Sequence, residues 1–239
     1  MCGRFTLRTG ATTLIEKFGG LLLFELPLQY NISPTQMVAT VRIGPEDAVR
    51  RWEMVRWGLI PSWAKEPSIG NRMINARAET VADKPAFRAA FRRRRCLVPA
   101  DGYFEWQKTR KSKQPYYIRR RDDLPFAMAG LWERWTDPQT DEPIETCTII
   151  TTEANELTRP IHDRMPVILD AAGYDRWLDP HLERPDPLRE LLRPFAAQAM
   201  RADPVDAYVN NPRNGGPQCI QPLPPETWHQ NNANCRWLL

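Results

Sequence analysis

The sequence predicts an α+β domain built on antiparallel β-sheet. Twenty-three prolines are spread between Pro27 and Pro225, and they disfavour long helices because proline fixes φ and lacks a backbone donor. Short β-branched or alternating runs recur along the chain, whereas helical spacing of apolar residues occurs in only three places. The 239 residues, 42% of them hydrophobic, are enough to bury one full core, so a single domain is expected.

Individual elements follow from these patterns. Apolar residues four positions apart predict helices over Thr12–Phe18 and Pro85–Phe91. A third helix is expected to begin with Asp186 as its N-cap and Pro187 in its first turn, followed by leucines on one face. The predicted strands are Met37–Ile43, Val49–Trp57, Tyr103–Gln107, Tyr116–Arg119, Cys147–Thr152 and Met165–Leu169.

The domain is expected to cover residues 1–222. From Asn210 onward the sequence is rich in Asn, Pro and Gly, which is typical of a segment that wraps the surface. Residues 223–239 are therefore predicted to form a poorly ordered tail.

Several classes of protein are disfavoured by composition. The best apolar run, Leu21–Phe24, is far shorter than the ~20 residues that cross a bilayer, so no membrane partner is expected. The five cysteines include no CxxC pair and no histidine pair accompanies them, so neither a metal site nor a disulfide framework is predicted. Reduced thiols indicate a cytoplasmic protein, and no cofactor is expected.

Positive charge is clustered although the net charge is only +4. Basic residues gather at 88–95, 108–113 and 119–121, and aromatic side chains lie between the clusters. This combination indicates a surface for a polyanion, and nucleic acid is the natural candidate.

The N-terminus carries the most specific chemical signal. Removal of Met1 would leave Cys2 with an α-amine and a thiol on adjacent carbons. Such a 1,2-aminothiol condenses with an aldehyde, because the amine forms an imine and the thiol then closes a five-membered thiazolidine ring on the same carbon.

Five further segments have compositions that a packed core does not require. They are Tyr30–Thr35, Val55–Trp63, Asn75–Thr80, Pro99–Trp106 and Ile161–Pro166. Together with the Met1–Phe5 start, this ordered set resembles the SRAP family, the SOS-response-associated peptidases, over residues 1 to about 222. The resemblance implies a barrel-like antiparallel core and a DNA-damage function: a covalent crosslink to abasic sites in single-stranded DNA. A monomer, associated with the nucleoid, is expected.

The resemblance also assigns roles to individual residues. Cys2 matches the crosslinking residue, and the motif positions of the remaining catalytic group are Asn75, Glu105 and His162. Arg4 and Arg77 match residues that contact DNA phosphates.

Physical reasoning supports these roles independently. An abasic sugar is mostly a closed hemiacetal, so exposing its aldehyde requires proton transfer. Glu105 lies between two aromatic residues, and burial would raise its pKa into the useful range. His162 titrates near neutrality, and the amide of Asn75 would orient the Cys2 amine. Arg4 and Arg77 are expected to lower the pKa of the Cys2 thiol.

Further residues are candidates for the DNA-binding surface. Trp63 follows Pro61 in a polar loop and could stack on a base, whereas Trp57 and Trp106 are expected in the core. Asn31 and Pro34 are expected to form a turn that closes one wall of the site.

Two other functions fit the same residues. Cys2, His162 and Glu105 would also suit a cysteine peptidase with nucleophile, base and orienting group. The basic clusters and aromatic residues alone would suit a non-covalent reader of single-stranded DNA.

Overall fold

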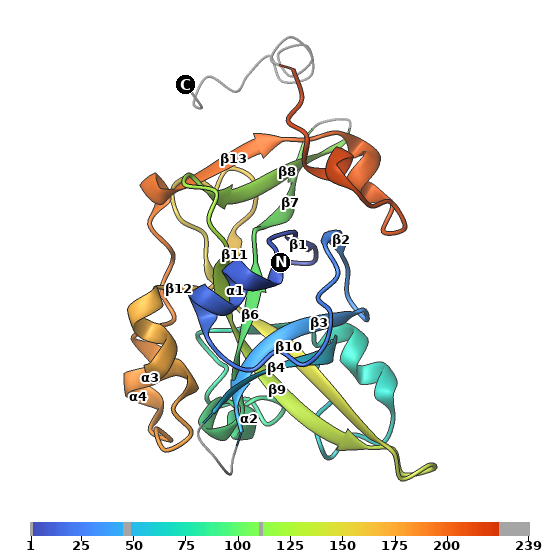
Figure 1. The fold of residues 1–239 in the computed structure, drawn as a ribbon, viewed down its shortest axis with the longest axis vertical. Coiled ribbons are helices and arrows are strands. Elements are labelled where there is room, and N and C mark those ends of the chain that lie inside the picture. Colours follow the sequence, from blue (N-terminus) through green and yellow to red (C-terminus); the bar gives the residue numbers. More distant parts are fainter. Residues whose placement is uncertain (1, 45–48, 110–111, 225–239) are drawn as a thin grey trace.

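The computed structural model describes residues 2–44, 49–109 and 112–224, which form two sheets flanked by short helices (Figure 1). The strands are β1 (Phe5–Leu7), β2 (Gln29–Ile32), β3 (Met37–Ile43), β4 (Arg50–Trp57), β5 (Asn75–Arg77), β6 (Arg95–Ala100), β7 (Gly102–Lys108), β8 (Lys113–Arg120), β9 (Phe126–Thr136), β10 (Pro143–Glu153), β11 (Arg164–Pro166), β12 (Ile168–Leu169) and β13 (Met200–Pro204). The helices are α1 (Ala11–Phe18), α2 (Arg88–Arg93), α3 (Tyr174–Leu178) and α4 (Pro185–Arg189), with 3₁₀ turns η1 (Pro67–Arg72), η2 (Ala171–Gly173), η3 (Ala197–Ala199), η4 (Ala207–Asn210) and η5 (Pro217–Ile220).

The larger sheet closes on itself. Its pairings run from β10 through β4, β3, β6 and β9 and return to β10, so five strands form a small barrel. Strand β10 is parallel to β4 and β5 and antiparallel to β9 and β11. The predicted α+β fold with a barrel-like core is therefore confirmed, and its sheet is mixed rather than purely antiparallel.

The smaller sheet has the order β13–β8–β7–β1–β2. Strand β1 lies inside it, antiparallel to β2 on one side and to β7 on the other, near the middle of the molecule (Figure 1). The start of the chain is thus held by main-chain hydrogen bonds on both edges.

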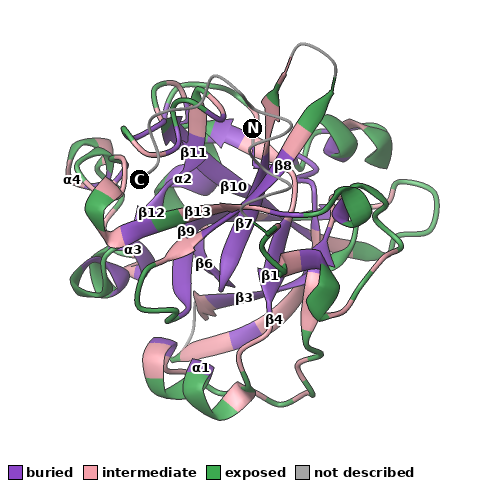
Figure 2. Ribbon diagram, turned by 90° about the horizontal axis from the view of Figure 1, so that it is seen from above, coloured by how far each residue is buried: buried purple, intermediate pink, exposed green. Residues whose placement is uncertain are grey.

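The main core lies between the two sheets. Phe5 and Tyr103 from the smaller sheet and Val38 and Ile149 from the larger one belong to a single buried cluster. Figure 2, a view from above, shows that most residues in the strands are buried. Helix α1 covers part of this core because its apolar residues, four positions apart, are both buried as predicted.

The predicted strands all occur, but some boundaries differ. The expected strand Met165–Leu169 is divided between β11 and β12, because Val167 instead bonds Ile150 and Ala129 on two neighbouring strands. Strands β1, β2, β5, β6, β9 and β13 were not predicted. Strand β6 is buried at every position and so carries no alternation.

Two helix boundaries were also predicted incorrectly. Helix α4 begins at Pro185 with Arg184 as its N-cap, so Asp186 lies in the first turn and caps nothing with its side chain. Helix α2 begins at Arg88 rather than Pro85, because the preceding residues form a turn closed on the Lys84 carbonyl oxygen.

The basic clusters at 88–95 and 119–121 are largely engaged within the fold. Arg95 is buried, and its guanidinium donates to the carbonyl oxygens of Phe91 and Trp177 at 2.7 and 2.6 Å. Arg119 and Arg120 form ion pairs with neighbouring aspartates. These arginines stabilise the domain and leave less charge for a polyanion than the sequence indicates.

The C-terminal part of the described chain runs through η4 and η5 and returns to the smaller sheet. Val205 pairs with Pro222, and the Leu223 amide donates to the Pro204 carbonyl oxygen at 2.8 Å. Residues 225–239 of the predicted tail lie outside the described residues, so its poor order and the boundary at 222 stay predictions. Within the described ranges, no helix is both long and apolar enough to span a membrane.

Gly102→Ala is expected to destabilise the domain by roughly 1–3 kcal/mol or more, because an added methyl overpacks a rigid site. A Cβ at Gly102 would lie 2.5 Å from the Tyr117 ring, which is itself buried. Urea unfolding measures the loss. Gly215→Ala is the control, because a Cβ there meets nothing within 4 Å, and equal stability of the two variants would contradict the packing argument.

Candidate functional site

Cys2 lies just before the start of β1, is fully buried and packs in the main core. The Phe104 amide donates to the Arg4 carbonyl oxygen at 2.9 Å, which extends the β1–β7 register toward the N-terminus. Cys2 thereby comes within electrostatic range of the Glu105 carboxyl group.

The thiol of Cys2 does not have the lowered pKa predicted from Arg4 and Arg77. Burial raises its pKa above the ordinary value, and the Glu105 charge adds to this effect. Desolvation is the largest cause, because a thiolate loses its water shell in the core, and a hydrogen bond from the Arg4 backbone lowers the pKa by less. The protein therefore holds Cys2 as a neutral thiol.

Glu105 is the buried carboxyl group that the sequence predicts. It lies in β7 with 3% of its surface exposed, and burial raises its pKa to about 7. A carboxyl group with this pKa exists in both protonation states near neutral pH, as a general acid and base requires.

His162 lies in the turn before β11, and this turn is held against β7. The Gln107 side chain donates from Nε2 to the Pro160 carbonyl oxygen at 3.0 Å. His162 Nδ1 accepts from the Arg164 amide at 3.0 Å and lies 2.9 Å from Asp163 Oδ1. Burial is the largest cause that lowers the pKa of His162, so its neutral form dominates at pH 7.

A cavity of about 400 Å³ joins Glu105 and His162. Its lining residues are Glu105, Trp106, Lys108, Lys113, His162 and Asn210. Trp106 was predicted in the core but is only half-buried, and its Nε1 donates to Asn210 Oδ1 at 2.7 Å. Its position directly after Glu105 was the available signal, whereas nothing in the sequence pointed to Asn210.

Asn75 begins β5, which pairs with β10 at Ile149. Its side-chain nitrogen donates to the Ile74 carbonyl oxygen at 2.8 Å. Its Oδ1 is buried and accepts no hydrogen bond from the described residues. An unsatisfied buried acceptor is costly, and it is well suited to receive an N–H group from a ligand or an amine.

Arg4 and Asn31 bind each other and the segment that runs through η4 and just beyond it. Arg4 Nη1 donates to Asn31 Oδ1 at 2.7 Å and to the Val209 carbonyl oxygen at 2.9 Å. Asn31 in turn donates to the carbonyl oxygens of Val209, Asn211 and Asn214. Asn31 thereby satisfies three backbone carbonyl groups, and its predicted place in the wall of a DNA-binding site stays a prediction.

Arg4 is half-buried, and the carbon of its guanidinium lies over the Trp106 ring, 5.8 Å from the ring centroid, so Arg4 lies beside the cavity. Pro34 is half-buried in the turn between β2 and β3, as predicted. Arg77 at the end of β5 and Trp63 in the loop after β4 are exposed, Trp63 by 59%. Their contacts with DNA stay predictions.

No group of metal-ligating side chains occurs in the described part of the chain. The four cysteines described there, Cys2, Cys96, Cys147 and Cys219, are all free and buried.

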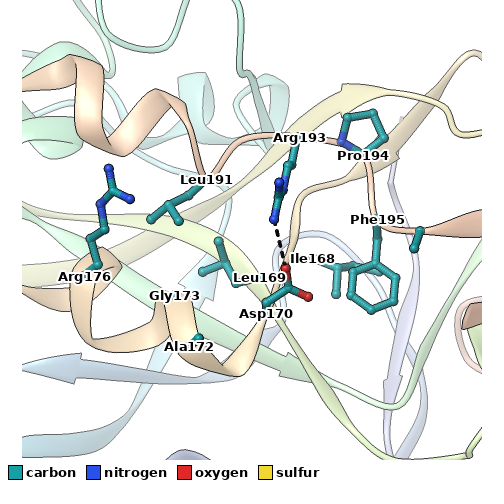
Figure 3. Close-up of a pocket in the computed structure, with 11 residues that line it drawn as sticks. Ile168, Leu169, Asp170, Ala172, Gly173, Arg176, Leu191, Arg193, Pro194 and Phe195 are labelled. Atoms are coloured by element: carbon teal, nitrogen blue, oxygen red, sulfur yellow. Dashed lines mark hydrogen bonds and ion pairs between the residues drawn. The ribbon is translucent and has the colours of Figure 1, made fainter.

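A second cavity, of about 490 Å³, lies between η2, α3 and the segment after α4 (Figure 3). An Arg193–Asp170 ion pair of 3.4 Å spans part of it. None of the residues predicted for the site lines this cavity. The candidate site is therefore the smaller cavity beside Glu105.

The model of the SOS response associated peptidase (SRAP) family matches residues 1–212. The chain belongs to the SRAP family. A curated SRAP relative, the abasic site processing protein YoqW of Bacillus subtilis, is 44% identical over 92% of this chain and 99% of its own length. The abasic site processing protein HMCES of Xenopus tropicalis is 35% identical over 70% of this chain and 56% of its own length.

Solved structures agree with this SRAP fold. A protein from Bacteroides thetaiotaomicron superposes with a TM-score of 0.82 at 29% identity, covering 93% of this chain and all of the other. A protein from Bordetella bronchiseptica gives a TM-score of 0.73 at 28% identity, over 86% of this chain and all of the other.

Proposed function

We propose that this chain processes abasic sites in single-stranded DNA by forming a covalent thiazolidine crosslink through Cys2 after Met1 is removed. The names of the curated relatives support abasic-site processing. The observation that carries the crosslink is a buried carboxyl group, Glu105, with a pKa of about 7 within electrostatic range of Cys2.

The chemistry requires proton transfer before any bond to the protein forms. In its acid form Glu105 gives a proton to the ring oxygen of the sugar, and a base takes the proton of the anomeric hydroxyl, which opens the ring to the aldehyde. Glu105 and His162 line one cavity and can share these two roles.

The crosslink then forms in two steps. The α-amine of Cys2 adds to the aldehyde carbon, and loss of one water molecule gives an imine. The thiol adds across the imine, forming the carbon–sulfur bond and leaving its proton on nitrogen. The high pKa of the thiol suits this order, because the amine reacts first and the sulfur follows within the same residue.

A cysteine peptidase is the alternative, and the description of the family records that activity. It would use Cys2, His162 and Glu105 as nucleophile, base and orienting group. The raised pKa of Cys2 disfavours a preformed thiolate, on which thiol proteolysis depends. We therefore rank the crosslinking function first, acting as a monomer in the cytoplasm where single-stranded DNA arises.

A denaturing gel tests the proposal. Protein that lacks Met1 is incubated with single-stranded DNA carrying one abasic site, and a heat-stable shifted band is expected. DNA carrying a tetrahydrofuran analogue, which has no aldehyde, is the control and should give no band. Absence of a band with the natural abasic site would reject covalent capture, and peptide cleavage would then be measured.

Trp63→Ala is expected to weaken capture of abasic DNA by roughly 1–3 kcal/mol, because an exposed aromatic side chain that stacks on a base is lost. Reaction of Cys2 with a small free aldehyde should be unchanged. Both rates are followed by mass spectrometry of the adduct. An equal loss with DNA and with the small aldehyde would contradict the stacking role.

A further inference from the structure

Lys108 and Lys113 face each other across the β7–β8 pair. They are the last residues in that register, and they are directly opposite. Side chains of directly opposite residues lie on the same face of a sheet, with Cβ atoms about 5 Å apart. Both lysines are exposed, and both line the cavity that contains Glu105 and His162.

This arrangement is unfavourable for the protein by itself. Like charges directly opposite each other destabilise a strand pair. Within the described ranges neither lysine has a carboxylate partner, whereas Arg119 and Arg120 on β8 are paired with aspartates. Among the described residues that line the cavity, Glu105 is the one acidic side chain, and its burial favours the neutral carboxyl form.

An anion between the two lysines would remove the repulsion. Two ammonium groups match a phosphate well, because each is a compact charge with three donors. The neighbouring wall of the cavity is Trp106, which shares a face of β7 with Lys108 and offers an aromatic surface beside the phosphate. A phosphodiester next to a sugar and a base has this combination of charge and apolar surface.

We propose that Lys108 and Lys113 form a phosphate subsite that holds one phosphodiester of single-stranded DNA beside the reactive cavity. The identity of the ligand rests on the proposed function. The role is binding and positioning, since neither lysine takes part in the proton transfers or the crosslink. The subsite would set which segment of the strand lies over Glu105 and Cys2.

The test measures equilibrium binding without the covalent step. Single-stranded DNA with one tetrahydrofuran analogue is titrated by fluorescence anisotropy between 50 and 200 mM salt. For single-stranded DNA, each phosphate contact contributes about −0.7 to the slope of log binding constant against log salt concentration. The slope of K108Q/K113Q should therefore be less steep than the native slope by at least about 0.7. The charge-retaining variant K108R/K113R should keep the native slope.

The charge-matched control is K17Q/K84Q, which removes two lysines that do not line the cavity. Thermal melting checks folding, and K108Q/K113Q should melt no lower than the native chain because the repulsion is gone. Identical slopes for K108Q/K113Q and K17Q/K84Q would overturn the subsite. Competition by inorganic phosphate as strong as by a dinucleotide would overturn its assignment to DNA.

The two proposals fail separately. A native chain that binds the analogue but never crosslinks to a natural abasic site would reject the covalent function and leave the lysine subsite to be judged by its salt slope. A native chain that crosslinks while the lysine variant binds like the control would reject only the subsite.

Discussion

Cys2→Ala, prepared without Met1, is expected to give no heat-stable complex with abasic single-stranded DNA. Alanine retains the α-amine and can still form an imine, but it has no sulfur to close the ring. Imines hydrolyse readily in water, so the adduct should disappear on heating. The measurement is the denaturing gel, with and without borohydride, which reduces an imine to a stable amine.

Cys2→Ser separates the two nucleophiles further. It keeps the amine and places a weakly nucleophilic hydroxyl where the thiol was, so a band should appear only after borohydride reduction. Cys219→Ala is the control for general loss of a buried cysteine, since Cys219 packs in a different hydrophobic cluster. A heat-stable, unreduced adduct with Cys2→Ala would disprove thiazolidine formation.

Glu105→Gln is expected to slow crosslinking by roughly 10²–10⁴-fold, the usual contribution of a positioned acid or base. The native rate should fall as pH rises through about 7, because the pKa of Glu105 is about 7 and the acid form, which we propose as the proton donor to the sugar ring oxygen, is then lost. Glutamine cannot titrate, so the rate of Glu105→Gln should not show this fall as pH rises through about 7. Single-turnover rates between pH 5 and 9 test the expectation.

The same substitution should stabilise the fold at high pH. Burial raises the pKa of Glu105 from 4.5 to about 7, so the folded state disfavours the charged form. The free energy of unfolding therefore falls by about 3 kcal/mol as pH rises from 4.5 through the folded-state pKa. Glu105→Gln should gain up to that amount at pH 8 and almost nothing at pH 4.

Urea unfolding at these two pH values shows whether the Glu105 carboxylate is destabilised by burial or stabilised by contacts within the fold. A variant less stable than the native chain at both pH values would mean that the Glu105 carboxylate is held by favourable contacts. The raised pKa, and the general-acid role built on it, would then be wrong.

Glu105 was predictable because its burial follows from local sequence. Its neighbours in a strand are Phe104 and Trp106, and two aromatic side chains beside a carboxyl group indicate an apolar environment. The exposure of Trp63 was predictable for the same kind of reason, since a polar loop surrounds it. Local composition sufficed in both cases.

The pKa of Cys2 depends on contacts between segments that are distant in the sequence. Counting nearby arginines in the sequence gave the wrong direction for the Cys2 thiol, because the strand that buries it lies about 100 residues later. Lys108 and Lys113 lie opposite each other because of the register between β7 and β8. The predicted strands stop at Gln107 and begin again at Tyr116, so they left out both lysines.

Barrel strands were missed for a related reason. Strand β6 is covered on both faces, so it lacks the alternation by which a half-buried strand is recognised. The burial of Arg95 was also unpredictable from sequence, because a run of arginines does not indicate which one is buried and donates to backbone carbonyl oxygens.

The interior position of β1 also orders events in time. Its neighbour β7 leaves the ribosome about 100 residues later, roughly 5–20 seconds at ordinary rates of synthesis. During that interval the nascent N-terminus is uncovered, and once the sheet forms Cys2 has no exposed surface. Under the proposed function, the Cys2 thiol is therefore open to other electrophiles only while the chain is being made, and the folded domain encloses it afterwards.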